Sequence, residues 1–162
     1  MNHKIVAMTP GDLQRFIDSN GIKATILPMA EHTPTVLDAA RALGAETDQI
    51  IKSLVFMANG SPLLVINNGL ARVDRRKLGE CLGINHKKVR FASPEQALAF
   101  SGYIVGSMPP FGHKQKLPTL VDKSVPGMDI IFAGGGGIDA MMQLTSLELL
   151  RVTRAKVVDI SE

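Results

Sequence analysis

The chain has little of what a disulfide-stabilised, aromatic-rich or membrane-spanning protein needs. Its 162 residues include one cysteine, no tryptophan and only 4% aromatic residues. One cysteine excludes an internal disulfide, and so few aromatic side chains argue against a stacking surface for single-stranded nucleic acid. The start, MNHKIVAMTPGDL, has neither a signal-peptide core nor the roughly 18 consecutive apolar residues of a membrane span. We therefore expect a cytoplasmic protein that does not contact a membrane.

The overall composition is that of an ordinary globular protein. Hydrophobic residues make up 45% of the chain and charged residues 20%. This length suits one domain over residues 1–162 with a core of its own. Cys81 follows Leu78 and precedes Leu82 at helical spacing, so we expect its thiol to pack in the core.

Positive charge is concentrated in the middle of the chain. Lys and Arg outnumber Asp and Glu eleven to four between residues 51 and 123, a net charge of +7, whereas the segments on either side each carry −2. A solvated helix face would explain such a cluster, and so would a surface for a polyanion such as RNA. The residues expected to contact RNA are Arg72, Arg75, Arg76, Lys87 and Lys88.

Cap and turn signals divide the chain into short, interleaved helices and strands. Helices are expected from the Thr9 cap to Gly21, within 33–44, from the Asp74 cap to Gly83, after Ser93-Pro94, and over 145–153. Strands are expected within 52–67, 89–91, 103–105, 117–122, 128–133, 140–144 and 155–160. Asn59-Gly60 predicts a hairpin turn, which Ser61-Pro62 would lengthen. Without a regular βαβ period, this order predicts an α+β fold around a mixed sheet.

Three familiar motifs are incomplete. AGGGGID lacks the last glycine of a dinucleotide fingerprint and the Lys of a phosphate loop, so a tight link between strands that needs glycine is the better interpretation. The four histidines and Cys81 show no metal-ligand spacing, and we expect no metal and no cofactor. Ser107 and His113 do not form a nucleophile elbow, and a third triad partner is lacking.

Two features remain as candidates for a functional site. Lys52 begins the apolar run KSLVFMA, where it either extends to water from a strand end or offers a compact charge to a phosphate or carbonyl. The loop YIVGSMPPFGH at 103–113 combines glycines, which allow close backbone approach, with prolines, which fix φ and remove donors. Such a stiff loop joins strands or holds a ligand.

The motifs HTPTVLDAARALG, IIKSLVF, GYIVGSMPPFGHKQKLPTLVD, FAGGGG and LLRVTRAKVVDI follow one another along nearly the whole chain. In this order the sequence resembles the YbaK/ProX family, the freestanding aminoacyl-tRNA deacylases related to the prolyl-tRNA editing domain. Its most specific parts are the lysine of KSLVF and the G-x-x-x-P loop from Gly106 to Pro110. The resemblance implies a mixed, barrel-like sheet flanked by helices, in agreement with the α+β expectation.

The resemblance also implies a site. Lys52 corresponds to the family's functional lysine and would hold the 3′-terminal nucleotide of a tRNA. Backbone N–H groups of Gly106, Ser107 or Met108 would hold the ester carbonyl and stabilise the oxyanion. A positioned water would then attack, and no side-chain nucleophile is required.

Further residues are expected to bind the substrate. They are His32, Thr35, Pro109, Pro110, Phe111, Gly112, His113 and Asp139. His32 and Thr35 have an alternative role in capping the second helix, and Asp139 matches an acidic position of the family in only one of two registers. A tRNA partner leaves two functions open. One is a hydrolase that clears mischarged tRNA, and the other is a non-catalytic module that binds a tRNA 3′ end or an aminoacyl nucleotide, with or without a synthetase beside it.

Overall fold

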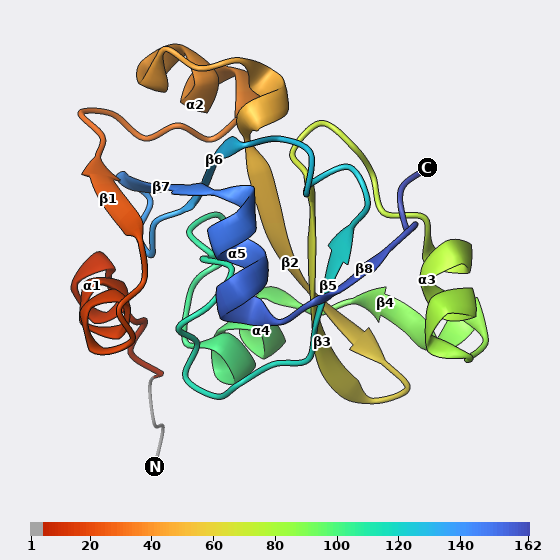
Figure 1. The fold of residues 1–162 in the computed structure, drawn as a ribbon. Coiled ribbons are helices and arrows are strands. Elements are labelled where there is room, and N and C mark those ends of the chain that lie inside the picture. Colours follow the sequence, from red (N-terminus) through yellow and green to blue (C-terminus); the bar gives the residue numbers. More distant parts are fainter. Residues whose placement is uncertain (1–4) are drawn as a thin grey trace.

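Two β-sheets form the centre of the computed structural model, which describes residues 5–162 (Figure 1). The first sheet is antiparallel and has the order β1 (Ala24–Pro28), β7 (Ala140–Thr145), β6 (Ile130–Gly134). The second has the order β4 (Val89–Phe91), β2 (Ile51–Ala58), β3 (Ser61–Asn68), β5 (Thr119–Asp122), β8 (Lys156–Val158). The β3–β5 and β5–β8 pairs are parallel and the other pairs antiparallel, so this sheet is mixed.

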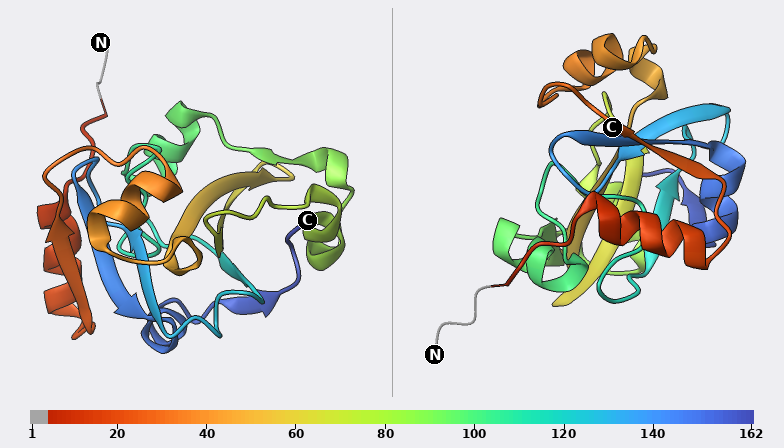
Figure 2. Two further views of the ribbon diagram at one scale, coloured as in Figure 1. Left: turned by 90° about the horizontal axis from the view of Figure 1, so that it is seen from above. Right: turned by 90° about the vertical axis from the view of Figure 1, so that its left-hand side faces the viewer.

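An isolated parallel bridge joins the sheets, where Ile50, just before β2, pairs with Phe132 of β6. Five helices surround them: α1 (Pro10–Ser19), α2 (Val36–Leu43), α3 (Arg75–Leu82), α4 (Pro94–Ser101) and α5 (Ser146–Thr153). Two short 3-10 helices, η1 (Thr47–Gln49) and η2 (His86–Lys88), lie in connections. Figure 2 shows α1 beside β1 at one side of the molecule and α3 near the C-terminus at the other. The expected α+β fold, a mixed, barrel-like arrangement of strands flanked by helices, is confirmed.

The cap signals were reliable guides to the helices. Thr9 accepts the Asp12 N–H while Asp12 accepts the Thr9 N–H, which closes a capping box in front of Pro10. Helices α2 and α3 end at Gly44 and Gly83, whose φ values of 64° and 70° are in the left-handed region that glycine adopts most easily.

The β2–β3 hairpin is also confirmed. Asn59 and Gly60 have φ values of 51° and 84°, as the two central residues of a type I′ turn require. Ala58 pairs directly with Ser61, so Ser61 and Pro62 belong to β3 and do not lengthen the loop.

One expected strand was wrong and one strand was missed. Residues 103–105 form no strand, because Gly102 and Gly106 have φ values of 87° and 94° and bend the chain on both sides of them. Tyr103 instead donates its N–H to the Ser101 hydroxyl. The missed strand, β1, pairs with β7 far along the chain.

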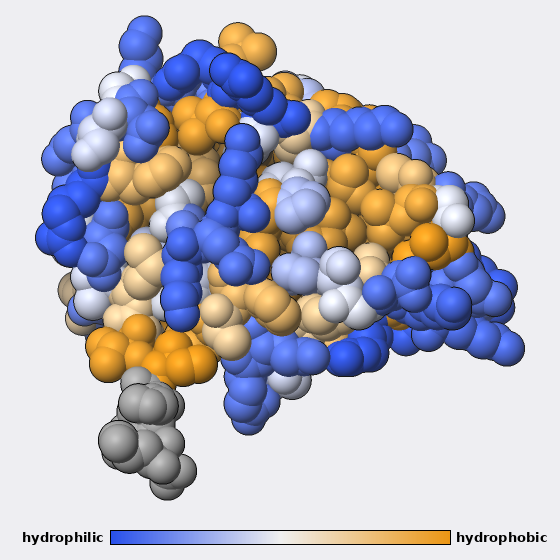
Figure 3. Space-filling model, turned by 90° about the horizontal axis from the view of Figure 1, so that it is seen from below, coloured by the Kyte–Doolittle hydropathy of each residue, from blue (hydrophilic) through white to orange (hydrophobic). Residues whose placement is uncertain are grey.

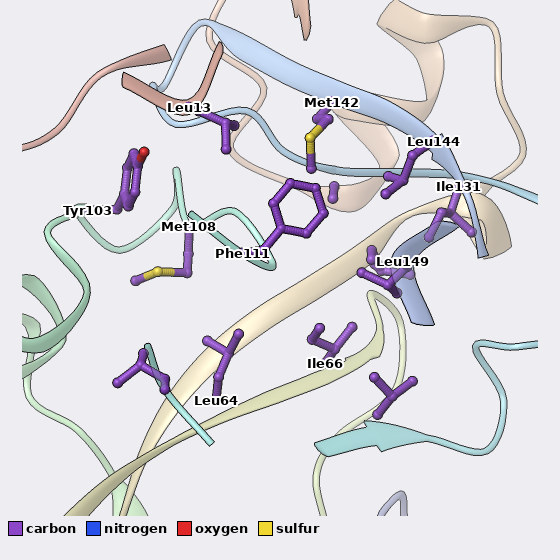
Figure 4. Close-up of a cluster of buried hydrophobic side chains, with 14 of the residues drawn as sticks. Leu13, Leu64, Ile66, Tyr103, Met108, Phe111, Ile131, Met142, Leu144 and Leu149 are labelled. Carbon is purple, nitrogen blue, oxygen red and sulfur yellow. The ribbon is translucent and has the colours of Figure 1, made fainter. Parts of the chain in front are cut away.

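The core fills both faces of the larger sheet. Alternate residues of β3 point to opposite faces: Leu64 and Ile66 join a large cluster with both sheets, α1 and α5, while Leu63 and Val65 join a second cluster beneath α3. Cys81 packs against the second cluster, as expected. Figure 4 shows Phe111 among the side chains of the large cluster.

A third, small cluster holds α2 in place. Ala39 and Ala40 of α2 pack with Ile50 and Phe132, the two residues that bridge the sheets. The N-terminus of α2 is thereby fixed over the start of β2, where Lys52 lies.

Candidate functional site

A pocket of about 310 Å³ lies between the start of α2, the first half of β2 and the loop after α4. Its lining includes Thr35, Lys52, Ser53, Gly106 and Met108. Three segments that are far apart in sequence therefore meet at one cavity. Its size is at the lower end of the range of small-molecule sites.

Lys52 is held by the hairpin and yet remains exposed. It is the second residue of β2 and pairs with Asn67 of β3, and its neighbours Ile51 and Ser53 are both buried. None of the ion pairs within residues 5–162 involves Lys52. Its ammonium is therefore available to a ligand in the pocket.

The loop that contains Gly106 and Met108 lines the same pocket. Gly106 has a φ of 94°, and neither its N–H nor that of Met108 donates a hydrogen bond to any residue in the range 5–162. The Ser107 N–H is different, because it donates to the Ile104 carbonyl at 3.2 Å. Of the three backbone donors expected from the sequence, the Gly106 and Met108 N–H groups are free and the Ser107 N–H is engaged.

Glycines of the β6–β7 connection hold this loop in place. The Gly136 N–H donates to the Ser107 carbonyl at 3.0 Å. At Gly134 a Cβ would lie 2.1 Å from the Met108 carbonyl oxygen, a distance that no side chain tolerates. The run AGGGG thus serves close approach between backbones, as its interpretation as a tight link predicted.

The prolines and His113 stiffen the second half of the loop. Pro109 and Pro110 are buried, and His113 Nε2 lies 2.8 Å from the Pro109 carbonyl oxygen. Burial lowers the pKa of His113, so the neutral imidazole donates this hydrogen bond. Ser107 Oγ donates to the Ile104 carbonyl at 2.9 Å. These separate partners leave Ser107 and His113 unconnected as nucleophile and base.

Several expected substrate residues lie away from Lys52. Pro110, Phe111, Gly112 and His113 line a different pocket. His32 is exposed and is not part of the Lys52 pocket. Thr35 lines the pocket and also caps α2 by accepting the Asp38 N–H at 3.0 Å.

Asp139 also lies outside the Lys52 pocket. It is exposed in the β6–β7 turn, where its carbonyl accepts the Met29 N–H at 2.7 Å. The structure therefore brings Lys52, Thr35, Gly106 and Met108 together, and it gives Asp139 a backbone role at the edge of β1.

Ser53 is the most informative residue that sequence reasoning missed. It lines the pocket, is 8% exposed, and its hydroxyl has no hydrogen-bond partner among the described residues. An unpaired buried hydroxyl is costly, and this one is shielded from solvent although Ser53 lines the pocket. Its only sequence signal is its position directly after Lys52.

The pocket has an apolar rim that was also missed. Phe91 is 57% exposed at the end of β4, where its ring stacks on Phe56, and Val105 is 60% exposed in the loop. Exposed apolar side chains around a pocket favour an apolar or aromatic ligand portion.

The five basic residues expected to contact RNA are all exposed, on or next to α3 and η2. Desolvation and the nearby positive charges of Arg76, Arg75 and Lys87 lower the pKa of His86. Arg75, Arg76 and Lys87 therefore lie close enough to His86 to make its surroundings electropositive. Hydrophilic side chains gather at the right-hand edge of the view in Figure 3, the side on which α3 lies in Figure 1.

Comparisons with known proteins identify the family of the chain. Residues 30–152 match the family model described as the aminoacyl-tRNA editing domain. The Bacillus subtilis protein YwhH, of uncharacterised function, is 30% identical over 124 residues, which cover 76% of this chain and 77% of YwhH. The proline–tRNA ligase of Ligilactobacillus salivarius is 32% identical over 120 residues, 74% of this chain but only 19% of the ligase.

A solved structure is similar over nearly the whole chain. The chain is similar to a protein described as a candidate trans-editing enzyme for prolyl-tRNA synthetase, with a TM-score of 0.88, 32% identity, and coverage of 94% of this chain and 96% of that one. Within residues 5–162, no helix is long and apolar enough to span a membrane.

Proposed function

The chain belongs to the aminoacyl-tRNA editing domain family, and on that ground we propose that it is a trans-acting deacylase that hydrolyses the ester bond of mischarged tRNA. The observation that supports the proposal is a single pocket lined by Lys52, which forms no ion pair within residues 5–162, and by Gly106 and Met108, whose N–H groups donate to no described residue. We take residues 1–162 as a single editing domain that acts in the cytoplasm.

The free N–H groups define where the reacting carbonyl binds. In the proposed complex the ester carbonyl oxygen accepts from the Gly106 and Met108 N–H groups. Negative charge develops on this oxygen when water attacks the carbonyl carbon, and fixed donors stabilise that charge without having to reorganise. The bond from the carbonyl carbon to the ribose oxygen then breaks. The ribose oxygen takes the proton that the attacking water releases, and the free amino acid leaves.

Lys52 anchors the other end of the ester. Its ammonium is a compact charge with three donors, suited to a phosphate of the terminal nucleotide or to a polarised carbonyl. A substrate held at the ribose and at the carbonyl together has its ester fixed in one orientation, and such positioning lowers the barrier for attack by water. The mechanism requires no metal and no side-chain nucleophile.

The remaining pocket residues suit the amino acid and the terminal base. We propose that the Ser53 hydroxyl, which has no hydrogen-bond partner among residues 5–162, turns toward a polar group of the substrate when the substrate binds. Phe91 and Val105 at the rim offer an apolar surface against which a base can stack or pack. We propose that the cluster of Arg72, Arg75, Arg76, Lys87 and Lys88 contacts tRNA phosphates and adds affinity without sequence specificity.

A deacylation screen across a panel of charged and mischarged tRNAs tests the function. We expect faster release of the amino acid than in buffer for at least one mischarged tRNA, with little effect on the matched correct pairs. Binding of tRNA without turnover of any species would instead identify a non-catalytic module that accompanies a synthetase.

A further inference from the structure

A second pocket, of about 570 Å³, shares no lining residue with the Lys52 pocket. It is bounded by α1, by the loop from Pro110 to Leu117 and by the C-terminal end of α5. The two pockets are therefore formed by successive parts of one loop: Gly106 and Met108 line the first, and the residues from Pro110 onward line the second. The deacylase mechanism uses nothing in the second pocket.

The charged residues that line it are all basic. Lys116, Arg151 and Arg154 line it, and no acidic residue does. Arg151 is neutralised by Glu148, to which its Nε and Nη2 donate at 2.6 and 2.8 Å. Lys116 and Arg154 form none of the ion pairs found within residues 5–162. Two cations are thus left for an anionic ligand.

The backbone conformation at Arg154 is unusual for a residue that carries a side chain. Arg154 ends α5 with a φ of 50° in the left-handed region. At the corresponding position α2, α3 and α4 have Gly44, Gly83 and Gly102, which adopt that conformation at little cost. The C-cap of α5 is instead an arginine, and the left-handed conformation costs free energy for any residue that carries a side chain.

Helix electrostatics explain only part of this charge. A cation at the C-terminal end of α5 offsets the helix dipole, which accounts for Arg151 and contributes at Arg154. Lys116 has no such explanation, because it lies in the loop and not at a helix end. Its exposed side chain adds charge to the pocket without serving a helix.

The floor of the pocket is apolar. Ile22, Phe111 and Leu117 are between 5% and 7% exposed, and the ring of Phe16 stacks on that of Phe111 with centroids 5.9 Å apart. A site for a bare inorganic anion would need polar walls throughout. This volume and this floor instead fit a ligand with an apolar or aromatic body, and the volume is within the range typical of small-molecule sites.

We infer that this second pocket binds a phosphomonoester with a flat apolar body, of the size and chemistry of a nucleoside monophosphate. A phosphomonoester carries a charge of about −1.5 to −2 at neutral pH, which matches the two unpaired cations better than a single carboxylate does. The phosphate binds Lys116 and Arg154, and the base lies over the Phe16 and Leu117 surface. The site is separate from the deacylase pocket and does not depend on that activity.

Titration of the full chain with AMP, followed by calorimetry and by backbone amide NMR, tests this inference. We expect saturable binding with shift changes at Asn20, Leu117 and Thr153, and binding of adenosine or inorganic phosphate weaker by about tenfold or more. Shift changes confined to Lys52 and Gly106 would place AMP in the deacylase pocket and overturn the inference. Equal affinity for adenosine and AMP would show that the pocket does not recognise the phosphate, and would overturn the inference. Tighter binding of phenylbutyrate than of AMP would also overturn it, because the ligand would then be a carboxylate.

Two variants and a matched control locate the phosphate. Arg154→Gly removes the guanidinium and leaves a residue that prefers the left-handed cap, so the fold is retained. It should weaken AMP binding by about tenfold, as should Lys116→Ala. Lys114→Ala removes a charge two residues away that does not line the pocket, and its affinity should equal that of the wild type. A uniform effect of all three substitutions, or no effect of the first two, would contradict the proposed phosphate site.

Discussion

Gly106 is the residue whose backbone the proposed mechanism needs most. A Cβ added there would meet nothing within 4 Å, but its φ of 94° is one that residues with side chains rarely adopt. Gly106→Ala therefore acts through the backbone and not through crowding, and it turns the N–H away from the substrate carbonyl. Loss of one oxyanion donor costs about 100-fold or more in turnover, and we expect a loss of that order in single-turnover deacylation.

Two other glycines provide controls for this substitution. Gly60 also has open space and a positive φ of 84°, but it lies at the tip of the β2–β3 hairpin, and Gly127 has open space without a positive φ. Gly60→Ala should lower the melting temperature and leave turnover intact, and Gly127→Ala should change neither. A folded Gly106→Ala protein with wild-type turnover would refute the oxyanion role.

Substitution of Ser53 distinguishes a role in substrate binding from a role in stability. Its hydroxyl is buried and unpaired, so Ser53→Ala removes a desolvation cost and should keep or raise the free energy of unfolding. If the hydroxyl binds the substrate, kcat/KM for deacylation falls by about tenfold in the same variant. Urea unfolding and deacylation kinetics measure the two effects, and an unchanged kcat/KM would remove Ser53 from the site.

Helix α5 depends on an internal ion pair that should respond to acid. The hydrogen bonds from Arg151, above all, and from the Lys23 N–H lower the pKa of Glu148 from 4.5 to about 2. Because the pKa is lower in the folded state, this stabilisation is complete above pH 4.5 and is lost as the pH falls towards about 2. The difference in unfolding free energy between wild type and Glu148→Gln should therefore shrink over this range. A difference independent of pH would show that the pair contributes nothing through ionisation.

The basic cluster of α3 and η2 should act through charge alone. If Arg75 contacts a tRNA phosphate, the logarithm of affinity falls linearly with the logarithm of salt concentration, and Arg75→Gln reduces the slope by about 1. Lys156→Gln removes one exposed charge from β8 and should leave the slope unchanged. Binding assays with several tRNAs measure both, and an affinity independent of salt would contradict the RNA surface.

Local signals predicted most of the elements, because they act over a few residues. Thr9 with Pro10, Gly44, Asn59-Gly60 and Gly83 each fix a cap or turn that the structure confirms. The strand expected at 103–105 was wrong because flanking glycines with positive φ outweighed its apolar residues. Strand β1 was missed because its partner β7 is remote in sequence, and local patterns do not report such pairing.

The sequence predicted two residues of the candidate site, Lys52 and Gly106, but not most of the other residues that line the pocket. Lys52 and Gly106 were found through their motifs, which the structure places at one pocket. Phe111 and His113 were expected to bind the same substrate because they are close in sequence, yet the rigid turn at Pro109 and Pro110 directs them to another pocket. Phe91 reaches the pocket only through tertiary packing, which no short motif records, and the position of Ser53 directly after Lys52 did not indicate that it lines the pocket.

The whole molecule brings α2, β2 and the Gly106 loop around one lysine, and the function proposed for it depends on that lysine more than on any other side chain. Lys52 is exposed at the end of a paired strand, so Lys52→Ala should change the free energy of unfolding by less than about 0.5 kcal/mol. Lys52→Arg keeps the charge but replaces a compact ammonium by a planar fork, and it should restore little activity.

Single-turnover deacylation of a mischarged tRNA by wild type, Lys52→Ala and Lys52→Arg, with the melting temperature as the folding control, tests the central claim most directly. The account predicts that both variants melt as the wild type does, that Lys52→Ala loses most of the rate, and that Lys52→Arg regains little of it. A folded Lys52→Ala protein that releases the amino acid at the wild-type rate would contradict the claim that this pocket performs the hydrolysis through Lys52.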